Sequence, residues 1–104
     1  MTGSPAETPT VEAAVGAVRR SLTIANKRGL HARAAAKFVR TAGQFDAVIR
    51  VGFKGQEVSG LSIMGLMMLA AGIGSTIELS CSGRQAAEAM TALSALVEGK
   101  FGED

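Results

Sequence analysis

The only histidine of this 104-residue chain, His31, lies between a Gly-Leu step and an alanine-rich run, and Arg33 follows two residues later. A neutral imidazole is a nucleophile near neutral pH, so it can accept a phosphoryl group and return it. The guanidinium of Arg33 carries a planar fork of donors that suits phosphate oxygens. If a helix begins here, the free amides of its first turn also favour an anion. These residues indicate phosphoryl chemistry. The alternative is a histidine that only caps the helix, beside a solvated arginine.

Other chemistries of a histidine have little support in the sequence. The chain holds no second histidine, and Cys81 is its single cysteine, so a zinc or iron–sulfur site lacks ligands. A Ser-His-Asp hydrolase is weakly supported because acidic residues are scarce near His31 and no nucleophile-elbow motif occurs. We therefore expect no metal and no cofactor, and we interpret Cys81 as a core residue without a redox role.

A second segment, SIMGLMMLAAG at residues 62–72, is apolar nearly all round although it is short. Helical spacing turns Leu66 and Leu69 toward the core and leaves three side chains facing outward: Ile63, Met64 and Met67. Exposed flexible apolar side chains, methionine above all, suit a surface that docks several partners. The alternative is that they complete a local core under a loop. We favour docking because so small a sheet offers little area to cover.

Ser62 stands directly before this apolar helix, at a position where serine is a preferred N-cap. A phosphate on its hydroxyl would find a favourable helix terminus and would bring about two negative charges next to the apolar residues. Such charge would weaken the binding of an acidic partner. Ser62 is therefore a hypothetical site of regulatory phosphorylation in addition to its capping role.

Positive charge is concentrated in the part of the chain that holds His31. Residues 19–54 contain nine of the eleven basic residues and one acidic residue, although the net charge of the chain is only +2. Five of these bases lie near the histidine in the sequence: Lys27, Arg28, Arg33, Lys37 and Arg40. The last three form one stripe on a helix. The distribution indicates an anionic ligand or an acidic partner protein that the stripe would steer.

The hydrophobic pattern predicts the elements that must position these residues. Period-2 alternation indicates strands, and a period of 3.6 residues indicates helices. The chain then divides into strands at 20–26, 46–53, 56–59 and 76–81, and helices at 31–43, at 62–74 and in a last segment up to Val97. Lys54 and Gly55 are expected to form a hairpin turn. Ser82 with Gln85 three residues on matches a capping box that would open the last helix.

This order of elements predicts an α+β fold. Its form is an open-faced β-sandwich, in which a four-stranded antiparallel sheet is covered on one face by three helices in the order βαββαβα. The two longest helices would cover the sheet and leave the middle one partly exposed. We expect a mobile N-terminal extension at residues 1–18 and one domain at 19–104. No signal peptide or bilayer-spanning segment is visible, so we expect a cytoplasmic monomer that binds no membrane.

Two segments about thirty residues apart carry a resemblance to a known family. NKRGLHARAAAKFV at residues 26–39 and SIMGLMMLAAGIGSTIELSCSG at residues 62–83 resemble the two signature regions of HPr. HPr is the histidine-containing phosphocarrier of the bacterial phosphoenolpyruvate-dependent phosphotransferase system. The similarity runs from about Arg20 to Phe101. Two separate motifs in register are a far more specific signal than the tripeptide His-Ala-Arg.

The resemblance implies a role for each residue that matches the family motifs. In Gly-Leu-His-Ala-Arg, His31 would be the residue that enzyme I phosphorylates on Nδ1, and Arg33 would steady the phosphoryl group. In Ser-Ile-Met-Gly-Leu, Ser62 would be the site used by HPr kinase/phosphorylase. Ile63, Met64 and Met67 would dock enzyme I and the IIA-type acceptor, with the nearby basic residues attracting these partners. By this resemblance the protein is a carrier rather than an enzyme.

One residue departs from the family pattern and bears on the branch of the family. The family usually has proline after the active-site arginine, and here Ala34 takes that place. The first turn of a helix accepts proline but does not need it, so Ala34 should loosen the turn without abolishing the chemistry. The departure favours the nitrogen-related branch, often called NPr, over a sugar-uptake HPr.

A small basic nucleic-acid-binding module is the main alternative of another class. Its support is the basic half of the chain and a pI of about 9.1. Against it, only four aromatic residues are available for base stacking, and no nucleic-acid-binding signature is visible. A regulatory interaction domain of similar topology is a third reading, but it leaves the apolar outer face of the middle helix unexplained.

Overall fold

The computed structural model describes residues 17–103, in which strands and helices follow the predicted order. The elements are β1 (Val18–Thr23), α2 (Ala32–Ala42), β2 (Val48–Phe53), β3 (Gln56–Ser59), α3 (Ile63–Met68), β4 (Thr76–Ser82), α4 (Ala86–Glu98) and a final 3-10 turn, η1 (Lys100–Gly102). The turn η1 was not predicted. The extension predicted at 1–18 lies outside the described residues except for its last two, and β1 begins at Val18, two residues before its predicted start.

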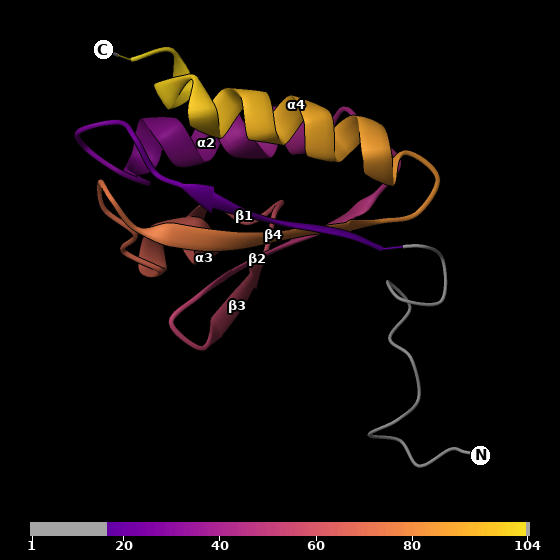
Figure 1. Ribbon diagram of the computed structural model, residues 1–104, viewed down its shortest axis with the longest axis horizontal. Helices are drawn as coiled ribbons and strands as arrows, with labels where there is room; N and C mark the ends of the chain where they lie inside the picture. The colour runs from indigo at the N-terminus through magenta and orange to yellow at the C-terminus, as the bar shows by residue number, and fades with distance from the viewer. Residues whose placement is uncertain (1–16, 104) are drawn as a thin grey trace.

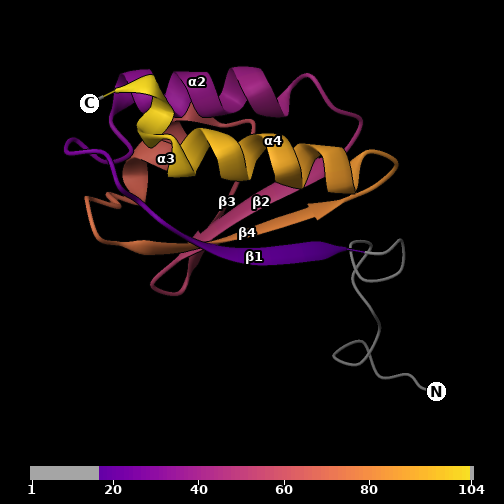
Figure 2. The same cartoon turned by 45° about the horizontal axis from the view of Figure 1, so that its top comes forward.

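The strands form one antiparallel sheet in the order β1-β4-β2-β3. Leu22 of β1 lies opposite Ile77 of β4, and Cys81 of β4 lies opposite Ile49 of β2. Figure 1 shows α2 and α4 side by side over one face of this sheet, and the short α3 lies at one end, next to α2 (Figures 1 and 2). The open-faced sandwich is confirmed, and α3 is the more exposed helix, as predicted.

An aliphatic core fills the space between the sheet and the two long helices. Strand alternation supplies one side of it, and the inward faces of α2 and α4 supply the other; the core includes Leu22, Ile24, Ile49, Val51, Ile77, Leu79, Ala35, Phe38, Met90, Leu93 and Val97. Cys81 belongs to this core, and its burial raises the pKa of the thiol to about 11. The thiol is therefore protonated at neutral pH, in agreement with a packing role.

The hairpin between β2 and β3 turns where the sequence predicts it. Lys54 (φ 49°) and Gly55 (φ 81°) both adopt left-handed backbone conformations, as a two-residue hairpin loop requires. Phe53 pairs with Gln56 across the turn. The turn therefore fixes the register of β2 against β3.

The capping box predicted for Ser82 and Gln85 is wrong. Ser82 is still the last residue of β4, where it pairs with Val48, and its buried hydroxyl has no partner among residues 17–103. The chain turns at Gly83, and α4 begins only at Ala86. Because sheet pairing holds Ser82 away from the helix, the Gln85 side chain instead accepts a hydrogen bond from the Asp46 amide at 2.7 Å.

The middle helix is shorter than predicted, because it ends at Met68 rather than near Gly72 or Gly74. Ala70 takes a left-handed conformation (φ 56°), which breaks the helix and turns Ala71 inward. The Ala71 carbonyl then accepts a hydrogen bond from the Leu30 amide at 3.0 Å. The segment after α3 therefore holds the loop that leads into α2.

Candidate functional site

His31 is the N-cap of α2, at the point where the sequence predicts the helix to begin. Its backbone is extended, and its Nδ1 accepts a hydrogen bond from the Arg33 amide at 3.3 Å. Gly29 before it has φ +67°, and a Cβ there would lie only 2.5 Å from the Ala71 carbonyl oxygen, so this position requires glycine. The loop therefore holds the imidazole at the start of the helix, with 16% of its side chain exposed.

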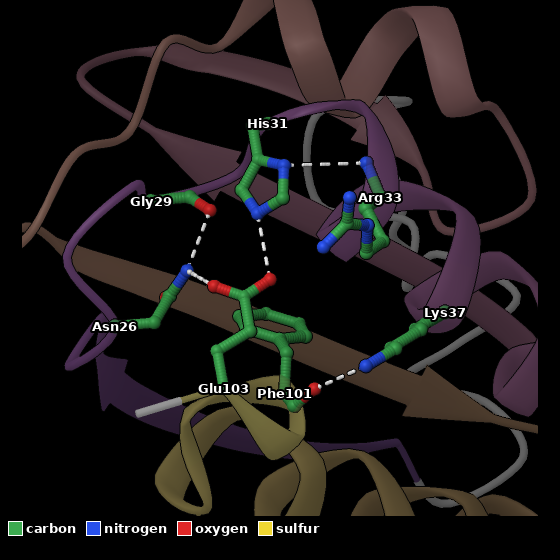
Figure 3. Close-up of polar contacts among 7 residues, drawn as sticks. All are labelled: Asn26, Gly29, His31, Arg33, Lys37, Phe101 and Glu103. Carbon is green, nitrogen blue, oxygen red and sulfur yellow. Dashed lines mark hydrogen bonds and ion pairs between the residues drawn. The ribbon is translucent and has the colours of Figure 1, made fainter.

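The second ring nitrogen of His31 faces the C-terminal end of the chain (Figure 3). Nε2 lies 2.7 Å from Oε2 of Glu103, a residue 72 positions away in the sequence. The other carboxylate oxygen, Oε1, accepts a hydrogen bond from Nδ2 of Asn26 at 3.1 Å. Asn26 is fully buried and also donates to the Gly29 carbonyl at 2.9 Å. The loop and the carboxylate are thus joined through one asparagine.

The tail that carries Glu103 is held against α2 by two contacts. Phe101 is fully buried in the core, and Lys100 and Phe101 both have positive φ (61° and 55°), which turns the chain back after α4. Nζ of Lys37 donates a hydrogen bond to the Phe101 carbonyl at 2.7 Å. In Figure 2 the tail lies beside the first turn of α2. The burial of Phe101 and its contact with Lys37 therefore hold the segment that carries the carboxylate.

The hydrogen bonds around the ring define its tautomer. A backbone amide can only donate, so Nδ1 accepts through its lone pair, and a neutral ring then carries its proton on Nε2, toward the carboxylate. The hydrogen bond from His31, together with that from Asn26, holds the pKa of Glu103 below its ordinary value, against the opposing effect of burial. Glu103 is therefore an ionised acceptor at neutral pH.

Basic side chains line an open hollow of about 360 Å³ beside the ring. Its lining consists of Lys27, Arg28, Arg33, Lys37, Gly102 and Glu103. Figure 3 places the guanidinium of Arg33 next to the imidazole, on the side of Nδ1. The structure thus brings together four of the five predicted bases. Arg40 is apart from them, exposed in the last turn of α2.

The apolar side chains predicted to face outward do so. Ile63, Met64 and Met67 are 39%, 67% and 37% exposed, whereas Leu66 is fully buried. The sequence reading missed three further exposed apolar residues within α3 or close to it in the sequence, namely Leu61, Met68 and Ile73. We call these six exposed residues the α3 surface. Ser62 caps α3, because its Oγ accepts a hydrogen bond from the Gly65 amide at 2.9 Å.

Two residues of the site were missed by sequence reasoning. Asn26 is part of the Asn-Lys-Arg-Gly turn, and its only signal was that asparagine favours turns. Glu103 had no local signal, since an acidic residue near the end of a chain is ordinary. Lys37 was predicted as a partner-binding base, and the structure shows it bonded to the tail.

The described part of the chain offers no other site of comparable chemistry. Within residues 17–103, no group of three or more His, Cys, Asp or Glu side chains could hold a metal ion. Over the same residues, no helix has the length and hydropathy needed to cross a bilayer. Among the described residues, the histidine with its carboxylate, amides and neighbouring bases is the candidate site.

Comparison with known proteins agrees with this geometry. The family model described as "PTS HPr component phosphorylation site" matches residues 18–99. The phosphocarrier protein HPr of Cupriavidus necator is 51% identical over 86 residues, which cover 83% of this chain and 97% of that protein. The phosphocarrier protein NPr of Shewanella violacea is 45% identical over 86 residues, which cover 83% of this chain and 94% of that protein. A crystal structure of HPr from Thermoanaerobacter tengcongensis superposes with a TM-score of 0.80 at 44% identity. The match covers 84% of this chain and 98% of that chain.

Proposed function

The chain belongs to the HPr family of the bacterial phosphotransferase system, a family of phosphocarriers, and from that premise we propose that His31 is its phosphoryl acceptor. In this proposal His31 receives the group on Nδ1 from phosphorylated enzyme I and passes it to a IIA-type protein. The protein acts as a carrier within the relay and needs no cofactor. We further propose that it works as a monomer in the cytoplasm. Its assignment to the nitrogen-related branch stays a prediction, because relatives of both names match it.

The geometry of the α2 cap supports attack by Nδ1. The Nδ1 lone pair bonds to phosphorus while the bond from phosphorus to the donor breaks, and that electron pair leaves with the donor. The Arg33 amide, which donates to Nδ1 at 3.3 Å before transfer, becomes free to donate to a phosphoryl oxygen. The first-turn amides and the helix dipole favour the added negative charge. The guanidinium of Arg33 supplies charge-assisted hydrogen bonds from beside the ring.

The observation that carries the proposal is that Arg33 and Glu103, which both contact the partly exposed ring of His31, line a hollow together with three further cations. A histidine that served only as a helix cap would need neither the hollow nor the bases around it. The fold brings together four positive side chains from the loop and from α2, although they repel one another: Lys27, Arg28, Arg33 and Lys37. A phosphoryl dianion offsets that repulsion.

The α3 surface supports the proposed binding of enzyme I and the IIA-type protein. Its exposed methionines are flexible and polarisable, so one surface can adapt to two partners. The bases around the hollow would draw acidic partners toward it, together with Arg40 in the last turn of α2. Increasing salt should therefore slow transfer between proteins, by screening long-range attraction.

The direct test is incubation with phosphoenolpyruvate and enzyme I, followed by intact mass measurement. We expect a single acid-labile phosphoryl adduct on the wild-type protein and none on His31→Ala. Circular dichroism of the variant is the folding control, because the substitution also removes the α2 cap. An adduct that persists in folded His31→Ala would refute the proposal and would revive the reading as a binding module.

Regulation at Ser62 is a separate proposal, in which HPr kinase/phosphorylase would be the partner. Ser62 is half-buried at the edge of the α3 surface, and its hydroxyl already lies at a helix N-terminus. Phosphorylation would put negative charge beside Ile63 and Met64 and would repel acidic partners. Ser62→Asp should weaken enzyme I binding while Ser62→Ala leaves it nearly unchanged. Equal affinity of the two variants would count against the proposal.

A further inference from the structure

One group in the site has no part in the transfer proposed above, namely the carboxylate of Glu103. It lies on the ring edge that carries Nε2, whereas the phosphoryl group would bond to Nδ1 (Figure 3). The Nε2 to Oε2 distance of 2.7 Å is that of a strong, charge-assisted hydrogen bond. The carboxylate therefore contacts the nucleophilic ring without competing for the reacting atom.

We infer that Glu103 is a positioning residue for phosphoryl transfer, acting through the imidazole of His31. This inference rests on the proposed function. By accepting a hydrogen bond from the N–H of Nε2, the carboxylate keeps the lone pair on Nδ1 and fixes the orientation of the ring. A carboxylate that orients a histidine in this way also stabilises the imidazolium that forms during reaction, as the buried aspartate does in serine-protease triads.

Charge balance along the reaction explains why a carboxylate helps. The neutral ring carries a proton on Nε2, and it gains a positive charge when Nδ1 bonds to phosphorus. No proton has to leave, because Nε2 keeps its proton and Oε2 of Glu103 faces it throughout. When the carrier gives up the phosphoryl group, the Nδ1–P electron pair returns to the ring and the same contact restores the starting tautomer. One carboxylate thus serves both directions of a reversible transfer.

The support behind Glu103 is what a positioning role requires. Asn26 fixes the second carboxylate oxygen at 3.1 Å, and Asn26 is itself fully buried and bonded to the Gly29 carbonyl. The buried ring of Phe101 anchors the tail two residues before, and Lys37 holds the Phe101 carbonyl. A freely moving terminal glutamate would have none of these contacts. Orienting groups of this kind are worth about 10- to 100-fold where their loss has been measured in metal sites.

The experiment measures two independent quantities on three variants of the full chain. The first is the rate of phosphorylation by phosphoramidate, a small donor that needs no docking surface; its P–N bond breaks and ammonia leaves. The second is the ¹⁵N NMR signals of the imidazole in the unphosphorylated protein at neutral pH. Glu103→Ala removes the acceptor and the charge, and Glu103→Gln removes only the charge. Glu88→Gln is the matched control, since Glu88 is an exposed carboxylate in the first turn of α4.

We expect Glu103→Ala to slow phosphorylation by about 10- to 100-fold and Glu103→Gln by less, with Glu88→Gln at the wild-type rate. The ring signals of Glu103→Ala should move toward a mixture of tautomers. A wild-type rate in Glu103→Ala would overturn the inference, and so would a slower rate with unchanged ring signals, because the carboxylate would then act elsewhere. If the wild-type protein takes no phosphoryl group on His31 at all, the proposed function fails instead, while the ring signals still report the contact with Glu103.

Discussion

The starts of α2 and α3 use the same local device in different surroundings. At α2, Nδ1 of His31 accepts the Arg33 amide at 3.3 Å, and at α3, Oγ of Ser62 accepts the Gly65 amide at 2.9 Å. Basic residues and a carboxylate surround the first cap, and a distant part of the chain holds that carboxylate. The second cap begins a six-residue helix without a single charged side chain, IMGLMM, whose exposed residues are apolar.

On the proposed function, this difference separates chemistry from recognition within one fold. Transfer at a nitrogen atom needs groups held in fixed directions, and the α2 cap has them through contacts from the loop, the helix and the tail. Docking to several partners would need a surface that can adapt, and the flexible methionines of the α3 surface would suit that role. The two regions adjoin, since α2 packs against α3, so a partner seated on one faces the other.

The largest expected effect comes from removing the anchor of the tail. Phe101→Ala should lower the free energy of unfolding by about 3–5 kcal/mol, because it empties a fully buried aromatic site. Phe53→Ala, at a half-exposed position at the end of β2, is the control and should cost less. Urea unfolding measures both.

The same variant tests whether the two caps are held differently. With the tail released in Phe101→Ala, the Arg33 amide should exchange its hydrogen faster, while the Gly65 amide changes only as much as overall stability does. Equal acceleration at both amides would contradict a special role of the tail at α2.

The next effect concerns the charge around the first cap. Arg33→Ala should slow phosphorylation by phosphoramidate about 10- to 100-fold, because hydrogen bonds to charged groups contribute about 1.5–3 kcal/mol. Arg40→Ala removes the same charge from the same helix, but Arg40 does not line the hollow, so its rate should stay close to wild type. Equal losses in the two variants would mean that only net charge matters.

A smaller effect is expected at the α3 surface. Met64→Ala should weaken the binding of enzyme I about tenfold, in the range of an interface residue whose truncation costs more than 1 kcal/mol. Val48→Ala truncates another exposed apolar residue, 48% exposed and on β2, and should leave binding unchanged. Isothermal titration would measure affinity, and the phosphoramidate rate of Met64→Ala should equal that of the wild type. A slower rate with that small donor would break the separation of chemistry from docking.

Removing the second cap should lower stability and leave the chemistry at His31 unchanged. Ser62→Ala should cost about 1 kcal/mol, the usual value of an N-cap hydrogen bond, with no change in the phosphoramidate rate. Ser62→Asp keeps a capping oxygen and should retain most of that stability. Thermal unfolding distinguishes the variants. A changed phosphoramidate rate in Ser62→Ala would contradict the expectation that the α3 cap does not affect transfer at His31.

The smallest effect is a dependence of stability on pH. The pKa of Glu103 is lowered in the folded protein, chiefly by its hydrogen bond with His31, so its contribution to stability is present above the ordinary glutamate pKa. That contribution is lost as the pH falls through the lowered folded value. The difference in unfolding free energy between wild type and Glu103→Gln should therefore shrink in acid. A difference that grows as the pH falls would contradict the assignment.

Much of the fold could be predicted because the signals are local. Alternation correctly predicted the strands β1, β2 and β4 to within about three residues at each end, and the Lys54-Gly55 pair predicted the turn. The capping-box pattern at Ser82 failed because strand pairing with Val48 keeps that residue in the sheet. The end of α3 was misplaced because a tertiary hydrogen bond to Ala71, which no local pattern signals, turns the chain early.

The site could be predicted only as far as its residues are neighbours in sequence. His31 and Arg33 lie in one helix turn, so their meeting followed from spacing. Glu103 reaches His31 across 72 positions, and it does so through the left-handed turn at Lys100 and Phe101, which is unusual for residues with side chains. The role of Asn26 could not be predicted for a similar reason, because it depends on a hydrogen bond to Glu103 at the far end of the sequence.

The central claim is that His31 uses Nδ1 as the phosphoryl acceptor while Glu103 holds the proton on Nε2. The most direct measurement is NMR of protein labelled with ¹⁵N-histidine after phosphorylation by enzyme I and phosphoenolpyruvate. The account predicts ³¹P–¹⁵N coupling at Nδ1 and a proton retained on Nε2. Coupling at Nε2 would contradict it, because that nitrogen would then have left the carboxylate that faces it in the structure.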